Sequence, residues 1–290
     1  MNTFKLKRKI KKIAWSKILV YIVLLMLVTF TSLPLVAMIC RAFMPLEELF
    51  IYPPRIFVRN PTLENFSDLF ISLDSSDVPF TRYIYNSLIT TVITVILTIV
   101  VSSMGAFSLV KYKPDGSKAI FTFVLAALMF SSHVTQIPNY MVVNKLGLID
   151  SYWSLIIPKI AVAYNFFLMK QFCEQIPNEL LESARIDGAS ELRLFWQIAM
   201  PLLKPAWSTL AVFAFVNNWN DYFSPLIYIS DQAKKTLPLA LQTLSGGPGV
   251  VARAGTVAAA TLATTAPTVI VFTIMKGRVM KTMAHSGIKA

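Results

Sequence analysis

A carboxylate, Asp221, stands inside an apolar run of the chain, with amide and phenol side chains around it. The polar members of this cluster are Asn217, Asn218, Asn220, Asp221 and Tyr222. Placing an ionisable group in such a run costs free energy, so the group usually faces a bundle interior or a water-filled pathway. Asn217 and Asn218 precede Asp221 by four and three residues, so a helix places all three on one face. The cluster therefore lines either a translocation path or a contact between helices, where each hydrogen bond contributes only ~0.6 kcal/mol.

The remaining reactive residues give no sign of an enzyme. The chain contains no GxxxxGK[ST] phosphate loop, so it has no evident means of using ATP itself. Its His, Cys and carboxylate residues show neither the spacing of metal ligands nor a catalytic triad. We therefore expect no catalytic residue, no metal site and no cofactor bound by this chain.

Three polar residues in other apolar runs are expected to be structural. Lys159 follows Pro158, and its long side chain can direct the ammonium group outward from the run. His133 and Gln136 are expected to form hydrogen bonds between helices rather than to bind a ligand.

The composition indicates that the chain lies in a membrane. Of the 290 residues 55% are hydrophobic and 14% are charged, against about 25% charged in a soluble globular protein. Six apolar runs approach or exceed the ~20 residues that a transmembrane helix needs. They cover residues 18–40, 84–110, 119–142, 152–172, 205–229 and 254–275. Because the runs are long and do not alternate, we predict an all-α integral membrane protein with one transmembrane domain over residues 18–290.

The distribution of Lys and Arg predicts the orientation. With the N-terminus in the cytoplasm, 18 of the 27 Lys and Arg lie in inner segments, eight in outer segments and one, Lys159, in a span. The positive-inside rule therefore predicts that both termini are cytoplasmic. We also expect the chain to lie in the cytoplasmic (inner) membrane. The inner segments also account for the whole formal charge of +12, so the charge gives no reason to expect nucleic-acid binding.

Three segments outside the spans are expected to have structure or contacts of their own. The basic arm 1–17 is either an amphipathic helix at the membrane surface or a solvated tail. In the long outer segment after the first span, Pro61 precedes a short helix with Leu63, Phe66 and Phe70 on one face. The loop between the last two spans is a candidate contact for a protein partner outside the membrane. Its candidate residues are Gly246, Gly247, Pro248 and Gly249.

The cytoplasmic segment 173–204, between the fourth and fifth spans, is predicted to form two short helices joined by a rigid corner. A helix over residues 178–186 ends at Gly188, which can adopt the left-handed backbone of a helix C-cap. Ser190 can cap a second helix, which Pro201 interrupts. The segment is therefore either a compact knob for a partner or an ordinary helical hairpin between spans.

This segment resembles the EAA loop of ABC-importer permeases. Its string ESARIDGASELRLFWQIAMPLLKP resembles the carbohydrate-importer version, close to the family of the smaller maltose-permease subunit. The coupling residues that the resemblance implies are Glu182, Ser183, Ala184, Asp187, Gly188, Ile198 and Pro201. Ser183 replaces the family's first Ala and Met200 its usual Leu, both mild departures. The stretch NNWNDYFSPLIY also resembles the family's fifth-span motif, and the C-terminal tail resembles a weakened form of its Gly-rich ending.

The resemblance implies a permease subunit of an ATP-binding-cassette importer that takes up a sugar or oligosaccharide by alternating access. Its implied partners are a second, homologous permease in a heterodimer, two ATPase subunits and an extracytoplasmic solute-binding protein. ATP and Mg²⁺ are then used by the ATPase, which holds the EAA loop in a cleft.

Two alternatives stay open. One is an ABC permease for a non-sugar solute such as a peptide, and the other is an ion-coupled secondary transporter. Inverted repeats and paired broken helices favour the ion-coupled class, and neither is visible in the sequence.

Overall fold

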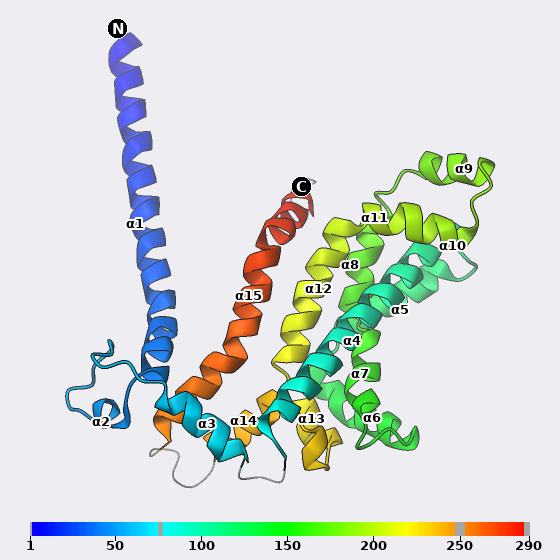
Figure 1. The fold of residues 1–290 in the computed structure, drawn as a ribbon. Helices are drawn as coiled ribbons and strands as arrows, with labels where there is room; N and C mark the ends of the chain where they lie inside the picture. Colours follow the sequence, from blue (N-terminus) through cyan, green and yellow to red (C-terminus); the bar gives the residue numbers. More distant parts are fainter. Residues whose placement is uncertain (1, 75–77, 247–252, 287–290) are drawn as a thin grey trace. The chain divides into compact units, whose positions relative to one another are not determined.

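The computed structural model describes residues 2–74, 78–246 and 253–286, and every regular element within these ranges is a helix (Figure 1). The label η marks two π-helices, η1 and η2, and one 3₁₀ helix, η3. In chain order the elements are α1 (Asn2–Ala42), α2 (Leu46–Leu49), α3 (Glu64–Asp74), α4 (Phe80–Phe107), η1 (Ser108–Tyr112), α5 (Ser117–Ala127), α6 (Ser132–Lys145), α7 (Tyr152–Ile160), α8 (Ala163–Cys173), α9 (Asn178–Ile186), α10 (Glu191–Arg193), η2 (Leu194–Ala199), α11 (Met200–Leu202), α12 (Lys204–Trp219), α13 (Phe223–Tyr228), η3 (Gln232–Lys234), α14 (Leu237–Ser245) and α15 (Ala254–Ser286).

The helices confirm an all-α membrane protein. Three stretches are long and apolar enough to cross a bilayer singly, namely Lys17–Ala42, Phe80–Tyr112 and Ala254–Gly277. Three further helix pairs pass the same criteria together but are bent, so the described residues hold three to six candidate spans. The six predicted spans agree with the upper number.

The third, fourth and fifth predicted spans are not single helices: the structure divides each of them between two helices. Residues 119–142 are divided between α5 and α6, which meet at 112°, and residues 152–172 between α7 and α8, which meet at 44°. The fifth predicted span, 205–229, is interrupted after Trp219, where α12 ends, and α13 begins at Phe223. Broken helices are therefore present, although none was visible in the sequence.

Local chemistry accounts for two of these breaks. Ser131 has extended backbone, and its hydroxyl accepts a 3.4 Å hydrogen bond from the amide of His133, so it caps the start of α6. Pro158 lies near the end of α7 and has no amide to continue the hydrogen-bond ladder. Together these residues turn single apolar runs into pairs of shorter helices.

The chain divides into two compact units, and the first comprises residues 1–71 and 247–263. In it α1 runs unbroken from Asn2, so the basic arm is helical and continuous with the first span. The predicted helix after Pro61 is confirmed as α3, and Leu63 and Phe70 are exposed, so a contact of this face with the membrane or a partner stays a prediction. Asn65 is buried, and its amide donates to the carbonyls of residues 42 and 44 at 3.0 and 2.7 Å.

The second unit, residues 72–246 and 264–290, is organised around α4. Helix α4 packs against α7, α8 and α12, and it buries a stripe of amide and hydroxyl side chains among them. Asn86 donates to the carbonyls of Ala233 and Lys235 at 2.8 Å each and accepts from the Tyr152 hydroxyl at 2.7 Å. Thr98 donates to the carbonyl of Lys159 at 3.3 Å. The polar stripe thus holds α4 against segments that lie 60 to 150 residues away in the chain.

An apolar cluster at the other end of α4 joins five elements. It contains Phe107 of α4, Met169 of α8, Leu181 of α9, Phe195 of η2 and Leu210 of α12, all at least nine-tenths buried. Burying large apolar side chains contributes roughly 1.5–3 kcal/mol each. This set, called the apolar cluster below, fixes the segment between the fourth and fifth spans to the bundle.

Gly255 of α15 is predicted to be intolerant of a side chain. A Cβ atom added there would lie 2.1 Å from the Asn65 side-chain oxygen, and the Asn65 amide is held by two carbonyls. Overpacking of this kind typically costs about 1–3 kcal/mol. We expect Gly255→Ala to lower the thermal stability of the purified chain in detergent, measured by intrinsic fluorescence. Gly277→Ala is the control, because an added Cβ meets no atom within 4 Å there; equal melting of the two variants would contradict the prediction.

Candidate functional site

A polar cavity of about 630 Å³ lies among α6, α7 and the α12–α13 junction. Hydroxyl and amide groups of α6 and α12 form much of its wall, together with the rings of Tyr222, Phe223 and Tyr228. Tyr228 also stacks on Tyr140, with ring centroids 6.2 Å apart. Amides with aromatic faces are a surface that can hydrogen-bond the hydroxyls of a solute and pack against its apolar faces.

Lys159 and Asp221 form an ion pair in the wall of this cavity. The exposed fractions of their side chains are 25% and 17%, so the pair is largely removed from solvent within this chain. The second carboxylate oxygen of Asp221 accepts the amides of Phe223 at 3.0 Å and Ser224 at 3.1 Å. Asp221 therefore starts α13 and binds the lysine of α7 at the same time. The expectation that Lys159 directs its ammonium outward is wrong, because Asp221 is within its reach.

Four of the five predicted cluster residues line the cavity, namely Asn217, Asn220, Asp221 and Tyr222. Asn218 does not, since its amide donates to the Ala214 carbonyl at 2.7 Å and borders a much smaller void. The predicted common helical face is wrong because α12 ends at Trp219, before Asp221. The side chain of Asn220 donates at 2.8 Å to the carbonyl of Val216, which also accepts the backbone amide of Asn220 at 3.2 Å.

The sequence interpretation missed the contribution of α6. Ser132, Thr135, Gln136 and Asn139 all line the cavity. Their spacing of three, four and seven residues is that of one helical face, so this polar stripe in an apolar run was a usable signal. Gln136 and His133 were expected to bond between helices, but the 3.4 Å hydrogen bond that the structure shows joins them within α6.

The segment between the fourth and fifth spans has the predicted corner. Helix α9 covers Asn178–Ile186 as predicted, and Gly188 has a φ of +82°, the left-handed backbone that favours glycine. The hydroxyl of Ser190 accepts from the amide of Arg193 at 3.4 Å, which confirms Ser190 as a helix cap. Figure 1 shows α9 at the end of the bundle, beyond α10.

Charged side chains brace this corner against the end of η1. Arg185 pairs with Glu191 at 3.1 Å and lies over the ring of Tyr112, 5.7 Å from its centroid. The Tyr112 hydroxyl also donates to Glu191. Lys111 donates to the carbonyl of Ile176 and, at 2.9 Å, to the side chain of Asn178. The first turn of α9 and the corner after it are thus both tied to one helix end.

The predicted coupling residues divide between an exposed face and the apolar cluster. Glu182, Ser183, Asp187, Gly188 and Pro201 are exposed, Ala184 is half-buried, and half-buried Ile198 packs against the cluster. On α9 itself Leu181 is 2% exposed, whereas Leu180 and Ile186 are 45% and 86% exposed. Helix α9 therefore has one anchored face and one open face that combines apolar and acidic side chains.

The predicted outer contact is only partly described. Gly246 caps the end of α14. Gly247, Pro248 and Gly249 lie outside the described residues.

The structure thus has apolar helices that break around a cavity and a braced helical corner, an arrangement that is consistent with a membrane permease. Residues 105–279 match the family described as "Binding-protein-dependent transport system inner membrane component". The chain belongs to this family, and it is accordingly an inner-membrane protein. The predicted resemblance to ABC-importer permeases is confirmed.

Relatives and a solved structure agree with this assignment. The chain is 36% identical to protein LplC of Bacillus subtilis over 74% of its own length and 70% of that protein. It is also 36% identical to the polygalacturonan/rhamnogalacturonan transport system permease protein YtcP of Bacillus subtilis, over 78% of this chain and 77% of that one. Its fold is similar to a chain in a bacterial ABC transporter involved in the import of the acidic polysaccharide alginate, with a TM-score of 0.78 at 20% identity, covering 91% of this chain and 96% of that one.

The ion pair at the cavity gives a prediction for a double-mutant cycle. Lys159→Met and Asp221→Asn each leave one largely buried charge without its partner, so each should lower the thermal stability of the purified chain, by about 2 kcal/mol or more. The double variant removes both charges, and the amide oxygen introduced by Asp221→Asn can still accept the backbone amides that start α13. It should therefore recover most of the loss. Losses that simply add in the double variant would show that the two side chains do not interact.

Proposed function

We propose that this chain is the permease subunit of an ATP-binding-cassette importer for an oligosaccharide. Membership of the binding-protein-dependent family supports this assignment, and so does the similarity to YtcP, a polygalacturonan/rhamnogalacturonan transport system permease protein. The main evidence for the mechanism is the burial of α9: one of its faces packs in the apolar cluster, and the other is exposed. A helix held in this way can transmit the movement of a partner to the spans.

The proposed topology has both termini in the cytoplasm. It follows from the excess of Lys and Arg in the segments that would then be internal. In this orientation residues 173–204, with α9 at their tip, face a cytoplasmic ATPase. The outer loop that includes Gly246 faces a solute-binding protein on the other side.

The coupling path runs through the apolar cluster. The exposed residues Glu182, Ser183 and Ile186 form the surface that docks in the ATPase, and Leu181 anchors the opposite face of α9. Through Leu181 the helix joins the apolar cluster, which also contains side chains of η2, α4, α8 and α12. Closure of two ATPase subunits on ATP and Mg²⁺ then displaces α9, and the cluster transfers that displacement to the spans.

The solute path includes the polar cavity. Amides, hydroxyls and tyrosine rings at its wall suit a molecule that presents many hydroxyls beside apolar ring faces. A second, homologous permease completes the pathway by facing this chain. Alternating access then exposes the shared path first to the binding protein and afterwards to the cytoplasm.

The test is uptake by the assembled importer in proteoliposomes with its binding protein outside and ATP inside. We expect ATP-dependent accumulation of labelled oligosaccharides from a panel of neutral and uronic-acid chains. Accumulation of peptides with no saccharide would assign another solute class. Uptake that follows an imposed ion gradient without ATP would assign the chain to the ion-coupled carriers.

Gly188 is predicted to be essential for coupling. Its φ of +82° strains any residue with a Cβ, and a β-branched side chain costs about 1–2 kcal/mol there. We expect Gly188→Val to misalign α9, so that transport and transport-stimulated ATPase activity both fall at a normal membrane level. Gly147→Val is the matched control, because Gly147 has a φ of +68° and equally open surroundings but lies between α6 and α7. Full transport by the Gly188→Val complex would overturn the proposed role of the corner.

The purified chain is predicted to hydrolyse no ATP by itself. The sequence offers no phosphate loop, so activity should require the partner ATPase and should disappear when the phosphate-loop lysine of that partner is replaced. A phosphate-release assay on the chain alone and on the assembled complex measures this. ATP hydrolysis by the chain alone would reveal a nucleotide site and would contradict the proposal that only the partner ATPase hydrolyses ATP.

A further inference from the structure

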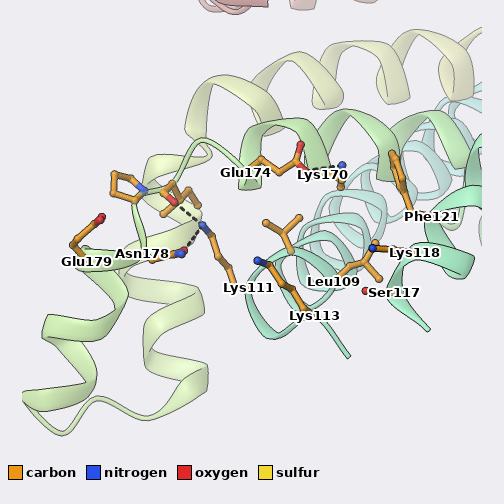
Figure 2. A pocket seen from close by; sticks show the side chains of 13 residues that line it. Leu109, Lys111, Lys113, Ser117, Lys118, Phe121, Lys170, Glu174, Asn178 and Glu179 are labelled. Atoms are coloured by element: carbon orange, nitrogen blue, oxygen red, sulfur yellow. Dashed lines mark hydrogen bonds and ion pairs between the residues drawn. The ribbon is translucent and has the colours of Figure 1, made fainter. Parts of the chain in front are cut away.

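A second cavity lies at the end of the bundle that carries the coupling corner. It has a volume of about 730 Å³ and is bounded by η1, the start of α5, the end of α8 and the start of α9 (Figure 2). Four lysines line it, Lys111, Lys113, Lys118 and Lys170, against two glutamates, Glu174 and Glu179. The cavity is therefore positively charged.

The four lysines are not equivalent. Lys170 pairs with Glu174 at 2.7 Å and lies 4.0 Å from the ring centroid of Phe121, and Lys111 is directed to Asn178 (Figure 2). Lys113 and Lys118 are exposed, and their ammonium groups form no ion pair with any residue that the structure describes. Two of the four positive charges are thus available to a ligand.

The position of the cavity matches the boundary of a membrane. The candidate span Phe80–Tyr112 ends here, and so does the bent pair that ends at Cys173. Leu109, Val110 and Phe121 add apolar side chains to the lining. A ligand held here meets both positive charge and apolar side chains, which is the chemistry that an anionic amphiphile needs.

We propose that this cavity binds the headgroup of an anionic phospholipid, with Lys113 and Lys118 at its phosphate and an acyl chain against Phe121. In the proposed topology it opens at the cytoplasmic leaflet, where anionic lipids attract basic residues next to the membrane. Basic pockets between transmembrane helices on that side are suitable headgroup sites.

Such a lipid would affect the coupling corner. Asn178 and Glu179, in the first turn of α9, line the same cavity as Lys113 and Lys118. A bound headgroup therefore lies between the η1–α5 connection and α9, and it neutralises the repulsion among the lysines that meet there. The anionic lipid thus stabilises the position of α9 from which the ATPase is engaged.

The proposal is tested by equilibrium binding of radiolabelled dioleoyl phosphatidylglycerol to the purified full-length chain in detergent. Dioleoyl phosphatidylcholine, with the same acyl chains, serves as the neutral lipid. A lysine near an anionic surface contributes on the order of a fivefold factor in affinity. We therefore expect Lys113→Gln/Lys118→Gln to weaken phosphatidylglycerol binding at least about tenfold. Lys145→Gln/Lys235→Gln, which removes two lysines that do not line the cavity, should leave binding unchanged.

Two further measurements complete the test: binding by a variant that keeps both positive charges, and competition between the lipid and inorganic phosphate. Lys113→Arg/Lys118→Arg should bind the anionic lipid like the unmodified chain, which separates loss of charge from loss of folding. Equal binding of the two lipids, or unchanged binding by the glutamine variant, would overturn the proposal. Complete displacement of the lipid by inorganic phosphate at equal concentration would show a site for free phosphate instead. Normal lipid binding by a glutamine variant that no longer assembles with the ATPase would assign these lysines to the protein partner.

Discussion

Backbone amides and carbonyls inside a bilayer must be paired within the protein, and this chain ends a helix inside an apolar run. The residues around Asp221 meet that requirement. Asp221 accepts the first amides of the next helix, and the side chains of Asn218 and Asn220 add hydrogen bonds to carbonyls of the ending one. Lys159 neutralises the carboxylate charge, and three of these residues, Lys159, Asn220 and Asp221, also line the cavity.

The cavity and the coupling corner are connected by one helix. Leu210 of α12 belongs to the apolar cluster, and Asn217, two turns later, lines the cavity. The sixteen residues of α12 form a rod about 24 Å long. Helix α4 packs along this rod: its buried hydroxyl and amide side chains extend from Asn86 to Ser103, and Phe107 belongs to the cluster. In the proposed mechanism a displacement of the cluster reaches the cavity wall through these two helices, with no loop between them.

The sequence predicted what depends on local chemistry. Helix α9, the left-handed Gly188 and the Ser190 cap follow from residue types within a few positions of one another, and all three are observed. The straightness of the spans was not predictable from apolar length alone, because a hydrophobic run does not reveal whether its middle is bent. The Lys159–Asp221 pair joins residues 62 positions apart, so it depends on packing that local patterns do not encode. The polar stripe of α6 is different: its spacing was present in the sequence.

The two π-helical stretches both meet the apolar cluster: Phe195 of η2 belongs to it, and Val110 of η1 packs against it. A π-helix closes its hydrogen bonds between residues five apart, one more than in an α-helix, so a stretch can exchange between the two forms while its backbone stays paired. Such an exchange shifts the register of everything beyond it by one residue, an axial step of about 1.5 Å. Both stretches in which such a step would occur therefore lie at the cluster that anchors α9. Small axial steps there can be absorbed or released without unfolding a turn.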